Sequence, residues 1–411
     1  MRILFLCLRC PYPPQRGDRI RSYNIIKELS KRHKITLVFF SESDVDIDAV
    51  KELETFCDRI EWVQFKKRYA LFNTAIHCFS RLPLQVHYWY NPKMQRVVND
   101  LLATEKFELI HAQLFRMGQY VVKANGMAKV LDLCDSLALN LSRRAELDCS
   151  PKRFLVKLEE KRVRRYEVEI MKSFDSGTVV AEFDKDYLLK QDKNLNLSVV
   201  PMGVDLEFYN PKTQQDVPTT PESESTNFTD DDIHETDAKN LLFTGTMNYF
   251  PNSDAVIYFC NEIFPLIKER YSDVNFYIVG NHPTEQVRRL AEQNGVIVTG
   301  YVEDIRPYFN KASVFVAPLR AGSGIQTKNL EAMAMRTPVV TTSIGAMGLE
   351  ADRESDLLIA DTPDIFANKV INLLEDPTHR RNIANAGRKR VELSYNWDVL
   401  VNRLEQVYDK I

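Results

Sequence analysis

The sequence predicts an α/β protein made of two parallel-sheet units, because the order strand, glycine loop, helix, strand occurs twice. The first occurrence begins with an apolar run at residues 3–8, and the second begins with one at residues 314–317. Short apolar runs are typical of buried strands, and such units bind ligands at the carboxyl ends of their strands. The 411 residues, 44% hydrophobic and 27% charged, suit a globular protein of two domains.

The N-terminal occurrence has a proline-rich loop between its first strand and its helix. This loop runs from Arg9 to Arg19 and contains one glycine, Gly17. The helix is expected to extend to about Arg32, and a second strand covers residues 35–40. Further strands are expected to end near residues 113, 135 and 180.

The segment 211–240 differs from the rest of the chain in composition. It holds eight acids and two lysines among many Ser, Thr and Pro residues. Such a segment cannot bury a core, so we predict a mobile acidic loop. Asp230, Asp231 and Asp232 lie inside it; they fit either a metal-binding D-x-D motif or, more simply, a solvated acidic run.

The C-terminal half opens with a strand at residues 241–244, a loop at Gly245 and a helix. Two more strands are expected at residues 275–280 and 295–300. The strand at 314–317 follows, then a loop of small residues, a helix from about Thr327, and a β-branched strand at 339–342. Thr337-Pro338 ends the helix before that last strand.

The loop and helix at residues 320–331 combine groups that suit a nucleotide. The helix N-terminus offers unpaired N–H groups and a partial positive charge, which favour phosphate. Arg320 and Lys328 flank this end with full charges, and Glu331 follows one turn into the helix. A carboxylate there can accept hydrogen bonds from both hydroxyls of a ribose. The simpler alternative is an ordinary strand-loop-helix unit in which Glu331 is a solvated acid.

The stretch from Gly322 to Val340 resembles the donor-site signature of family-four retaining glycosyltransferases, which have the GT-B fold. It reads GSGIQTKNLEAMAMRTPVV and is most similar to the pattern G-G-G-x-x-x-K-x-L-E-A-M-A-x-x-x-P-V-V. The whole chain also resembles the sugar transferases of exopolysaccharide clusters associated with the exosortase/PEP-CTERM system. Two doubly wound, Rossmann-like domains facing a cleft are therefore expected.

The resemblance also implies domain boundaries. The turn Val199-Val-Pro-Met-Gly-Val-Asp205 matches the family's turn before the second domain. We expect an acceptor-side domain at 1–205, a domain that binds the nucleotide sugar at 206–390, and a C-terminal helix at 391–411 that returns to the first domain.

The implied reaction transfers a sugar from a nucleotide diphospho-sugar to an acceptor, with retention of configuration, no metal and no cofactor other than the donor. The residues that match the family's motifs fall into two groups. Those expected to act in catalysis are Lys328, Arg320 and His111. Those expected to contact the donor are Glu331, Gly324, Ile325, Ser323, Gly245, Gly17 and Arg19.

Three departures from the family pattern limit this assignment. Gln113 replaces the second histidine of an H-x-H motif, so His111 fits either a cleft residue or a structural one. Ser323 stands where the family has the first acid of an E-x7-E pair. The arginine and lysine that usually follow the glycine at position 245 are missing.

Partners and location follow from charge, cysteines and the resemblance. The net charge of −3 gives no reason to expect nucleic acid, and seven cysteines without a spaced framework suit a reducing, cytoplasmic compartment. The family's acceptors are glycans or lipid-linked glycans. The basic segment 143–165 fits either an anionic membrane surface at the inner face of the plasma membrane or a solvated helix face.

Two other functions stay open. A GT-B nucleotide-sugar epimerase would need a dense set of acids and histidines around the sugar. A non-catalytic protein that binds nucleotide sugar or glycan would account for Ser323 and for the missing cations.

Overall fold

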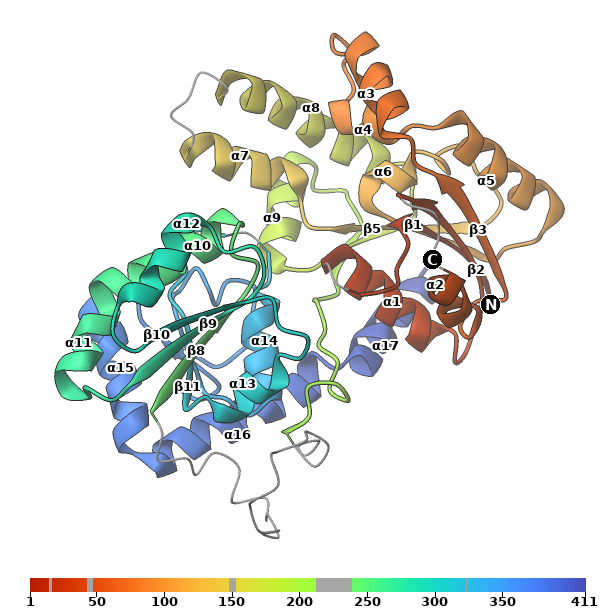
Figure 1. Ribbon diagram of the computed structural model, residues 1–411. Coiled ribbons are helices and arrows are strands. Elements are labelled where there is room, and N and C mark those ends of the chain that lie inside the picture. Colours follow the sequence, from red (N-terminus) through yellow and green to blue (C-terminus); the bar gives the residue numbers. More distant parts are fainter. Residues whose placement is uncertain (15–16, 43–46, 148–152, 212–238, 323) are drawn as a thin grey trace. The chain divides into compact units, whose positions relative to one another are not determined.

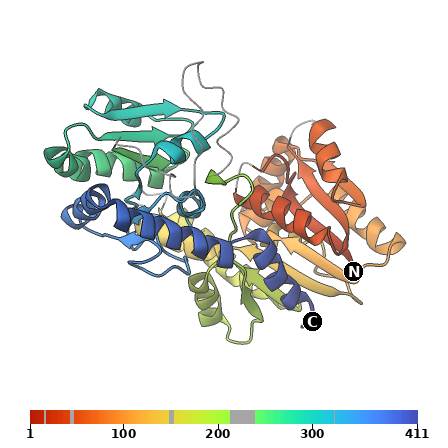
Figure 2. The same ribbon diagram turned by 90° about the horizontal axis from the view of Figure 1, so that it is seen from below.

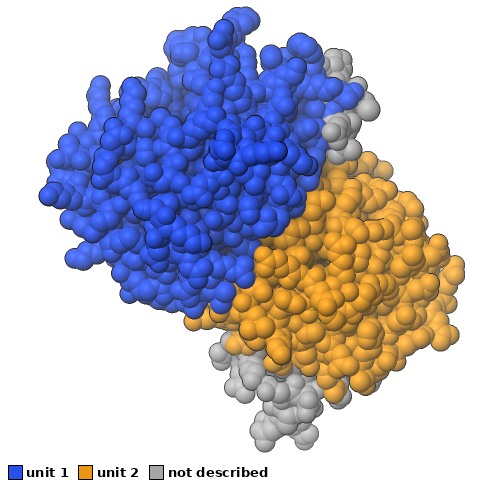
Figure 3. Space-filling model, turned by 180° about the vertical axis from the view of Figure 1, so that it is seen from behind, with its two compact units in different colours: residues 1–202, 397–411 blue, residues 203–396 orange. Residues whose placement is uncertain are grey.

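The computed structural model describes residues 1–14, 17–42, 47–147, 153–211, 239–322 and 324–411. It divides into two compact units, which are residues 1–202 with 397–411 and residues 203–396 (Figure 3). The boundaries expected from the sequence were 205 and 391. Most of the expected mobile loop at 211–240, including Asp230 to Asp232, lies outside the described residues.

Unit 1 is a parallel sheet of seven strands in the order β3-β2-β1-β4-β5-β6-β7, with helices on both faces (Figure 1). Its strands are β1 (Arg2–Arg9), β2 (Lys34–Ser41), β3 (Arg59–Gln64), β4 (Leu109–Gln113), β5 (Ala128–Cys134), β6 (Ser176–Val179) and β7 (Leu197–Val199). Its helices are α1 (Gly17–Leu29), α2 (Ile47–Glu54), α3 (Lys67–Ile76), α4 (Leu84–Trp89), α5 (Pro92–Thr104), α6 (Leu114–Gly118), α7 (Leu137–Leu147), α8 (Arg153–Met171), α9 (Glu182–Gln191) and α17 (Trp397–Tyr408).

Strand β1 lies at the centre of this sheet, paired in parallel with β2 and β4. Residues 3–8 are all fully buried, because helices cover both faces of the sheet. This explains why the strand is a continuous apolar run instead of an alternating one.

The last helix, α17, packs against α1 (Figures 1 and 2). The carboxylate of Glu405 accepts hydrogen bonds from Arg32 at 2.6 Å and contacts the ring of His33 at 2.6 Å, just beyond the end of α1. The final segment of the chain is therefore part of unit 1, although the residues before it belong to unit 2.

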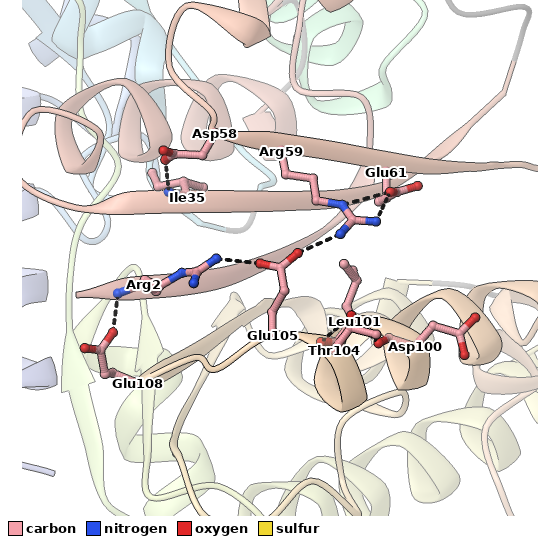
Figure 4. A network of polar contacts seen from close by, with 10 residues as sticks. All are labelled: Arg2, Ile35, Asp58, Arg59, Glu61, Asp100, Leu101, Thr104, Glu105 and Glu108. Atoms are coloured by element: carbon pink, nitrogen blue, oxygen red, sulfur yellow. Dashed lines mark hydrogen bonds and ion pairs between the residues drawn. The ribbon is translucent and has the colours of Figure 1, made fainter.

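Ion pairs join the strands at the amino-terminal edge of the unit 1 sheet (Figure 4). Glu105 bridges Arg2 and Arg59, each at 2.7 Å, and Glu108 accepts from the backbone N–H of Arg2. Exposed pairs of this kind contribute about 0–1 kcal/mol each. This edge is therefore held by surface contacts, while the opposite edge carries the loops expected to bind ligands.

Unit 2 is a parallel sheet of six strands in the order β10-β9-β8-β11-β12-β13. Its strands are β8 (Asn240–Thr244), β9 (Asn275–Val279), β10 (Val296–Gly300), β11 (Val314–Ala317), β12 (Val339–Thr341) and β13 (Leu358–Ile359). Its helices are α10 (Phe250–Tyr258), η2 (Phe259–Ile263), α11 (Phe264–Arg270), α12 (Glu285–Arg289), η3 (Leu290–Glu292), α13 (Arg306–Lys311), α14 (Thr327–Ala334), α15 (Pro363–Glu375) and α16 (Pro377–Ser394).

Alternate residues of the unit 2 strands enter two separate cores. Val314 and Val316 of β11 pack into the core that includes α15, whereas Phe315 and Ala317 pack into the core that includes α14. A sheet covered on both faces is the doubly wound arrangement, so the predicted fold class is confirmed. Within the described part of the chain, no helix is both long enough and apolar enough to span a membrane.

A buried ion pair fixes α1 to the centre of the unit 1 sheet. Arg21 is 1% exposed and donates to both carboxylate oxygens of Asp132 on β5, at 2.6 and 3.1 Å. Its third hydrogen bond goes to the carbonyl oxygen of Pro201, at 2.9 Å. The charge of Arg21 is therefore used inside the protein.

Replacing Arg21 with Met should strongly destabilise unit 1, because it leaves the carboxylate of Asp132 buried and unpaired. We expect a loss of about 3–5 kcal/mol in the free energy of unfolding, measured by urea denaturation. The matched control is Arg32→Met, which removes a surface partner of Glu405 and should cost about 1 kcal/mol or less. Equal unfolding midpoints for the two variants would contradict the role of Arg21 as the stabilising partner of buried Asp132.

Candidate functional site

The carboxyl edge of the unit 2 sheet has its topological switch point between β8 and β11. Strand β8 leads to β9 on one side, whereas β11 leads to β12 on the other. Loops at such a point diverge and leave a crevice, where doubly wound sheets bind their ligands. The loop after β8 begins at Gly245, and the loop after β11 carries Arg320 and leads into α14.

The loops after β8 and β9 touch through their backbones because Gly280 has no side chain. A Cβ atom at Gly280 would lie 1.8 Å from the carbonyl oxygen of Gly245, and φ of Gly280 is +150°. The N–H of Gly245 donates to Val279 O at 3.0 Å, and the N–H of Met247 donates to Asn281 O at 2.9 Å. The position of Gly245 is therefore fixed by its neighbouring loop.

The ammonium group of Lys328 lies beside Gly245. Its Nζ would be 3.2 Å from a Cβ atom at that glycine. It donates a hydrogen bond to Oδ1 of Asn252 and lies 4.4 Å from the ring centroid of Phe243. The amide of Asn252 in turn donates to Thr246 O at 3.0 Å, which orients the oxygen that Lys328 contacts.

Lys328 is only 8% exposed, and none of the carboxylates of the described residues forms an ion pair with it. Burial lowers the pKa of Lys328 to about 7, an effect that nearby Glu331 partly offsets. A buried cation of this kind is stabilised by any anion that enters the site.

Glu331 is half-buried one turn further along α14. Burial raises the pKa of Glu331 to about 7, while Lys328 and hydrogen bonds from the side chains of Thr327 and Tyr209 act in the opposite direction. The site therefore holds an acid and a base whose pKa values both lie near 7.

Tyr209 was not predicted from the sequence. Arg388 positions it by donating both to Tyr209 O, at 2.8 Å, and to Ala334 O at the end of α14, at 2.6 Å. The edge of its ring packs against Phe309. Only its place just after the turn at Asp205 could have indicated it.

The loop before α14 contributes less charge to the crevice than expected. Arg320 donates to both carboxylate oxygens of Asp254, at 3.0 and 2.6 Å, and lies over the ring of Tyr258. Its charge is therefore already paired. Gly324 has φ of +70° with nothing within 4 Å of an added Cβ, which leaves open space before the helix.

Two of the predicted donor contacts, Ser323 and Ile325, come just before α14 in the sequence. The side chain of Ile325 is partly buried and packs against the core that contains α14. Ser323 lies outside the described residues. Among the described residues, no side chain caps the N-terminus of α14 at Gln326, so N–H groups at the very start of the helix are left for a ligand.

In unit 1, Gly17 and Arg19 lie at the start of α1, at the carboxyl edge of that sheet. Nothing lies within 4 Å of a Cβ atom added to Gly17. The guanidinium of Arg19 is 3.9 Å from Glu42, and its Nε atom is buried without a hydrogen-bond partner. Arg19 therefore still has donor capacity for a ligand.

His111, the third residue expected to act in catalysis, lies inside unit 1. It is fully buried, stacked on Phe5 with a centroid distance of 4.3 Å, and its Nδ1 atom is 2.8 Å from the hydroxyl of Tyr408. Burial lowers the pKa of His111 to about 4, although Asp132 acts in the opposite direction. In this structure His111 joins β4 to α17, and its expected catalytic role stays a prediction.

Comparison with known proteins identifies the chemistry of unit 2. Residues 238–376 match the family model described as "Glycosyl transferases group 1". The protein is a glycosyltransferase. Among the described residues of this transferase, no three His, Cys, Asp or Glu side chains are grouped closely enough to hold a metal ion.

One relative extends the similarity beyond unit 2, and a second matches a shorter part of the chain. An uncharacterized 44.6 kDa protein in the cps region of Klebsiella pneumoniae is 21% identical over 93% of both chains. The capsular polysaccharide biosynthesis glycosyltransferase CapM of Staphylococcus aureus is 27% identical over 36% of this chain and 40% of its own length.

A solved structure shows that the fold is GT-B. The Anabaena protein Alr3699/HepE in complex with UDP superimposes with a TM-score of 0.65 at 15% identity, covering all of both chains. The transferase thus has the GT-B fold that its sequence predicted.

Gly280→Ala should destabilise unit 2, because its methyl group would overlap the carbonyl oxygen of Gly245. We expect a cost of about 3 kcal/mol from overpacking together with backbone strain, measured by thermal unfolding. Gly126→Ala is the matched control, because Gly126 also has positive φ (+85°) but open space around it. The control should lose about 1–2 kcal/mol. Equal losses would show that the loop contact at Gly245 is not tight.

Proposed function

We propose that this transferase moves a sugar from a nucleotide diphospho-sugar to a hydroxyl of a glycan or lipid-linked acceptor in exopolysaccharide biosynthesis. The donor would bind at the carboxyl edge of unit 2, between the loop at Gly245 and the N-terminus of α14. The observation that carries this proposal is the buried ammonium of Lys328, which has no carboxylate partner among the described residues.

The charge of a departing diphosphate is the main energetic demand of this reaction. In the proposed mechanism, Lys328 and the uncapped N–H groups of α14 contact the phosphate oxygens. Fixed groups of this kind stabilise developing negative charge without reorganising. Burial lowers the pKa of Lys328. A bound phosphate anion would raise this pKa again and keep the ammonium group protonated.

Glu331 is the proposed partner of the ribose. Its carboxylate would accept hydrogen bonds from the two hydroxyls, while Thr327 and Tyr209 hold its orientation. Arg320 is proposed as a secondary phosphate contact. Its guanidinium would first have to break its ion pair with Asp254 or share it with the phosphate. From unit 1, we retain Gly17 and Arg19 as proposed donor contacts, since Arg19 has an unused Nε–H group.

We further propose retention of configuration without a metal ion. The sequence resemblance supports both features. Lys328 and the α14 N-terminus supply the positive charge that a metal ion would otherwise provide, so the leaving phosphate can itself assist attack of the acceptor on the same face of the sugar.

The proposed biological setting is polysaccharide assembly at the cytoplasmic face of the membrane. The cps-region relative and the capsular biosynthesis relative support the polysaccharide class. The narrower proposal, a role in a PEP-CTERM/exosortase-associated cluster, rests on the sequence resemblance alone.

The test is release of sugar from a panel of UDP-, GDP- and TDP-sugars by the pure protein in the presence of EDTA. One donor should be hydrolysed slowly, and Lys328→Ala should lower that rate by about 100-fold. The control is Lys389→Ala, which removes an exposed lysine of α16 and should leave the rate unchanged. Activity that disappears in EDTA and returns with Mg²⁺ or Mn²⁺ would refute the metal-free proposal. No turnover of any donor would refute the transferase mechanism at Lys328.

A further inference from the structure

Helix α3 has its apolar side turned toward solvent. The residues it buries are Ala70 and Asn73, a small residue and a polar one. The residues it exposes include Leu71, Phe72 and Ile76. A surface helix normally buries its large apolar residues, so this reversed pattern indicates that α3 meets a partner.

The turn after α3 and the start of α8 extend the same apolar surface. Phe79 is 96% exposed and Phe154 is 72% exposed. Leu155 and Leu158 are also exposed. Large aromatic side chains in water at these fractions are rare in a protein without a binding surface there.

Two hydrogen bonds hold the turn and α8 together. Arg162 donates to Cys78 O at 2.9 Å, and Glu159 accepts from the N–H of Leu84 at 2.6 Å. Leu155 and Leu158 precede these two residues by one turn of α8, on the same side of the helix. The exposed residues of α3 and α8 thus belong to one surface, and Figure 1 shows the two helices as neighbours.

The α3 side of this surface carries cations and no acids. Residues 65–99 contain no Asp or Glu. Seven exposed cations form no ion pair within the described part of the chain. They are Lys66, Lys67, Arg68, Arg81, Arg153, Lys157 and Lys161.

We propose that this α3–α8 face docks on the surface of an anionic lipid bilayer. The face comprises the seven cations together with Leu71, Phe72, Ile76, Phe79, Phe154, Leu155 and Leu158. Aromatic and aliphatic side chains beside lysine and arginine suit the boundary between acyl chains and negative headgroups. This inference gives a surface to the proposed membrane location, and it does not depend on the transfer reaction.

The test is cosedimentation with phosphatidylcholine vesicles that contain or lack phosphatidylserine, in the absence of any donor. The parent protein should bind the anionic vesicles and be released as salt rises. Phe72→Ser with Phe79→Ser should weaken binding by at least about 10-fold, because both exposed rings leave the interface. The matched control is Ile365→Ser with Leu393→Ser, two exposed residues of unit 2, and should bind like the parent.

A second variant separates the electrostatic contribution. Lys66→Gln with Lys67→Gln should weaken binding by about 5-fold for each charge on anionic vesicles, and should have no effect on neutral ones. Both double variants should melt at the parent temperature and keep its rate of donor hydrolysis. Failure of the transferase proposal would leave vesicle binding intact, so the two proposals fail separately.

Three results would overturn the proposal. The first is absence of binding to anionic vesicles at low salt. The second is equal vesicle binding by the Phe variant and its control. The third is that the parent protein self-associates but binds no vesicles, and that the Phe variant no longer self-associates. The last result would show that a second copy of the chain covers this face.

Discussion

The burial of one ammonium group is the constraint on which the proposed donor site depends. Lys328 is almost excluded from water, and its contacts are an amide oxygen and an aromatic ring. Burial without a carboxylate is unfavourable for a cation, as the lowered pKa of about 7 reflects. An entering phosphate removes that penalty, so the site is arranged to favour an anion over water.

The rest of unit 2 serves to keep this group in place. The backbone contact between Gly245 and Gly280 fixes the loop after β8, and Asn252 links that loop to the ammonium. Arg388 holds the far end of α14 and the backbone of Tyr209. The positions of Lys328 and Glu331 are therefore set by the sheet and its loops, which limits the reorganisation that donor binding requires.

Local patterns in the sequence were sufficient to predict the fold, and they also point to the residues of the proposed donor site. The apolar runs, the glycine loops and the Lys328–Glu331 spacing are all contained within single strand-loop-helix units. What could not be predicted depends on contacts between distant segments. Tyr209 reaches Glu331 across more than one hundred residues, Asp254 pairs with Arg320, and Tyr408 covers His111. The burial of His111 depends on α17, whose position no pattern near His111 reveals.

The most direct measurement is the affinity of the protein for its nucleotide-sugar donor, the one identified by the hydrolysis panel. It is measured by calorimetry between about pH 5.5 and 8.5, with acceptor absent. The diphosphate requires protonated Lys328, and the ribose requires ionised Glu331. Since the pKa values of both groups are about 7, affinity should peak near pH 7 and fall on both sides. Glu331→Gln should bind about 10-fold or more weakly at pH 7 and lose the decline at acid pH; Lys328→Met should lose the decline at alkaline pH. An affinity that is independent of pH in the parent, or unchanged in a folded Glu331→Gln variant, would show that the donor binds elsewhere.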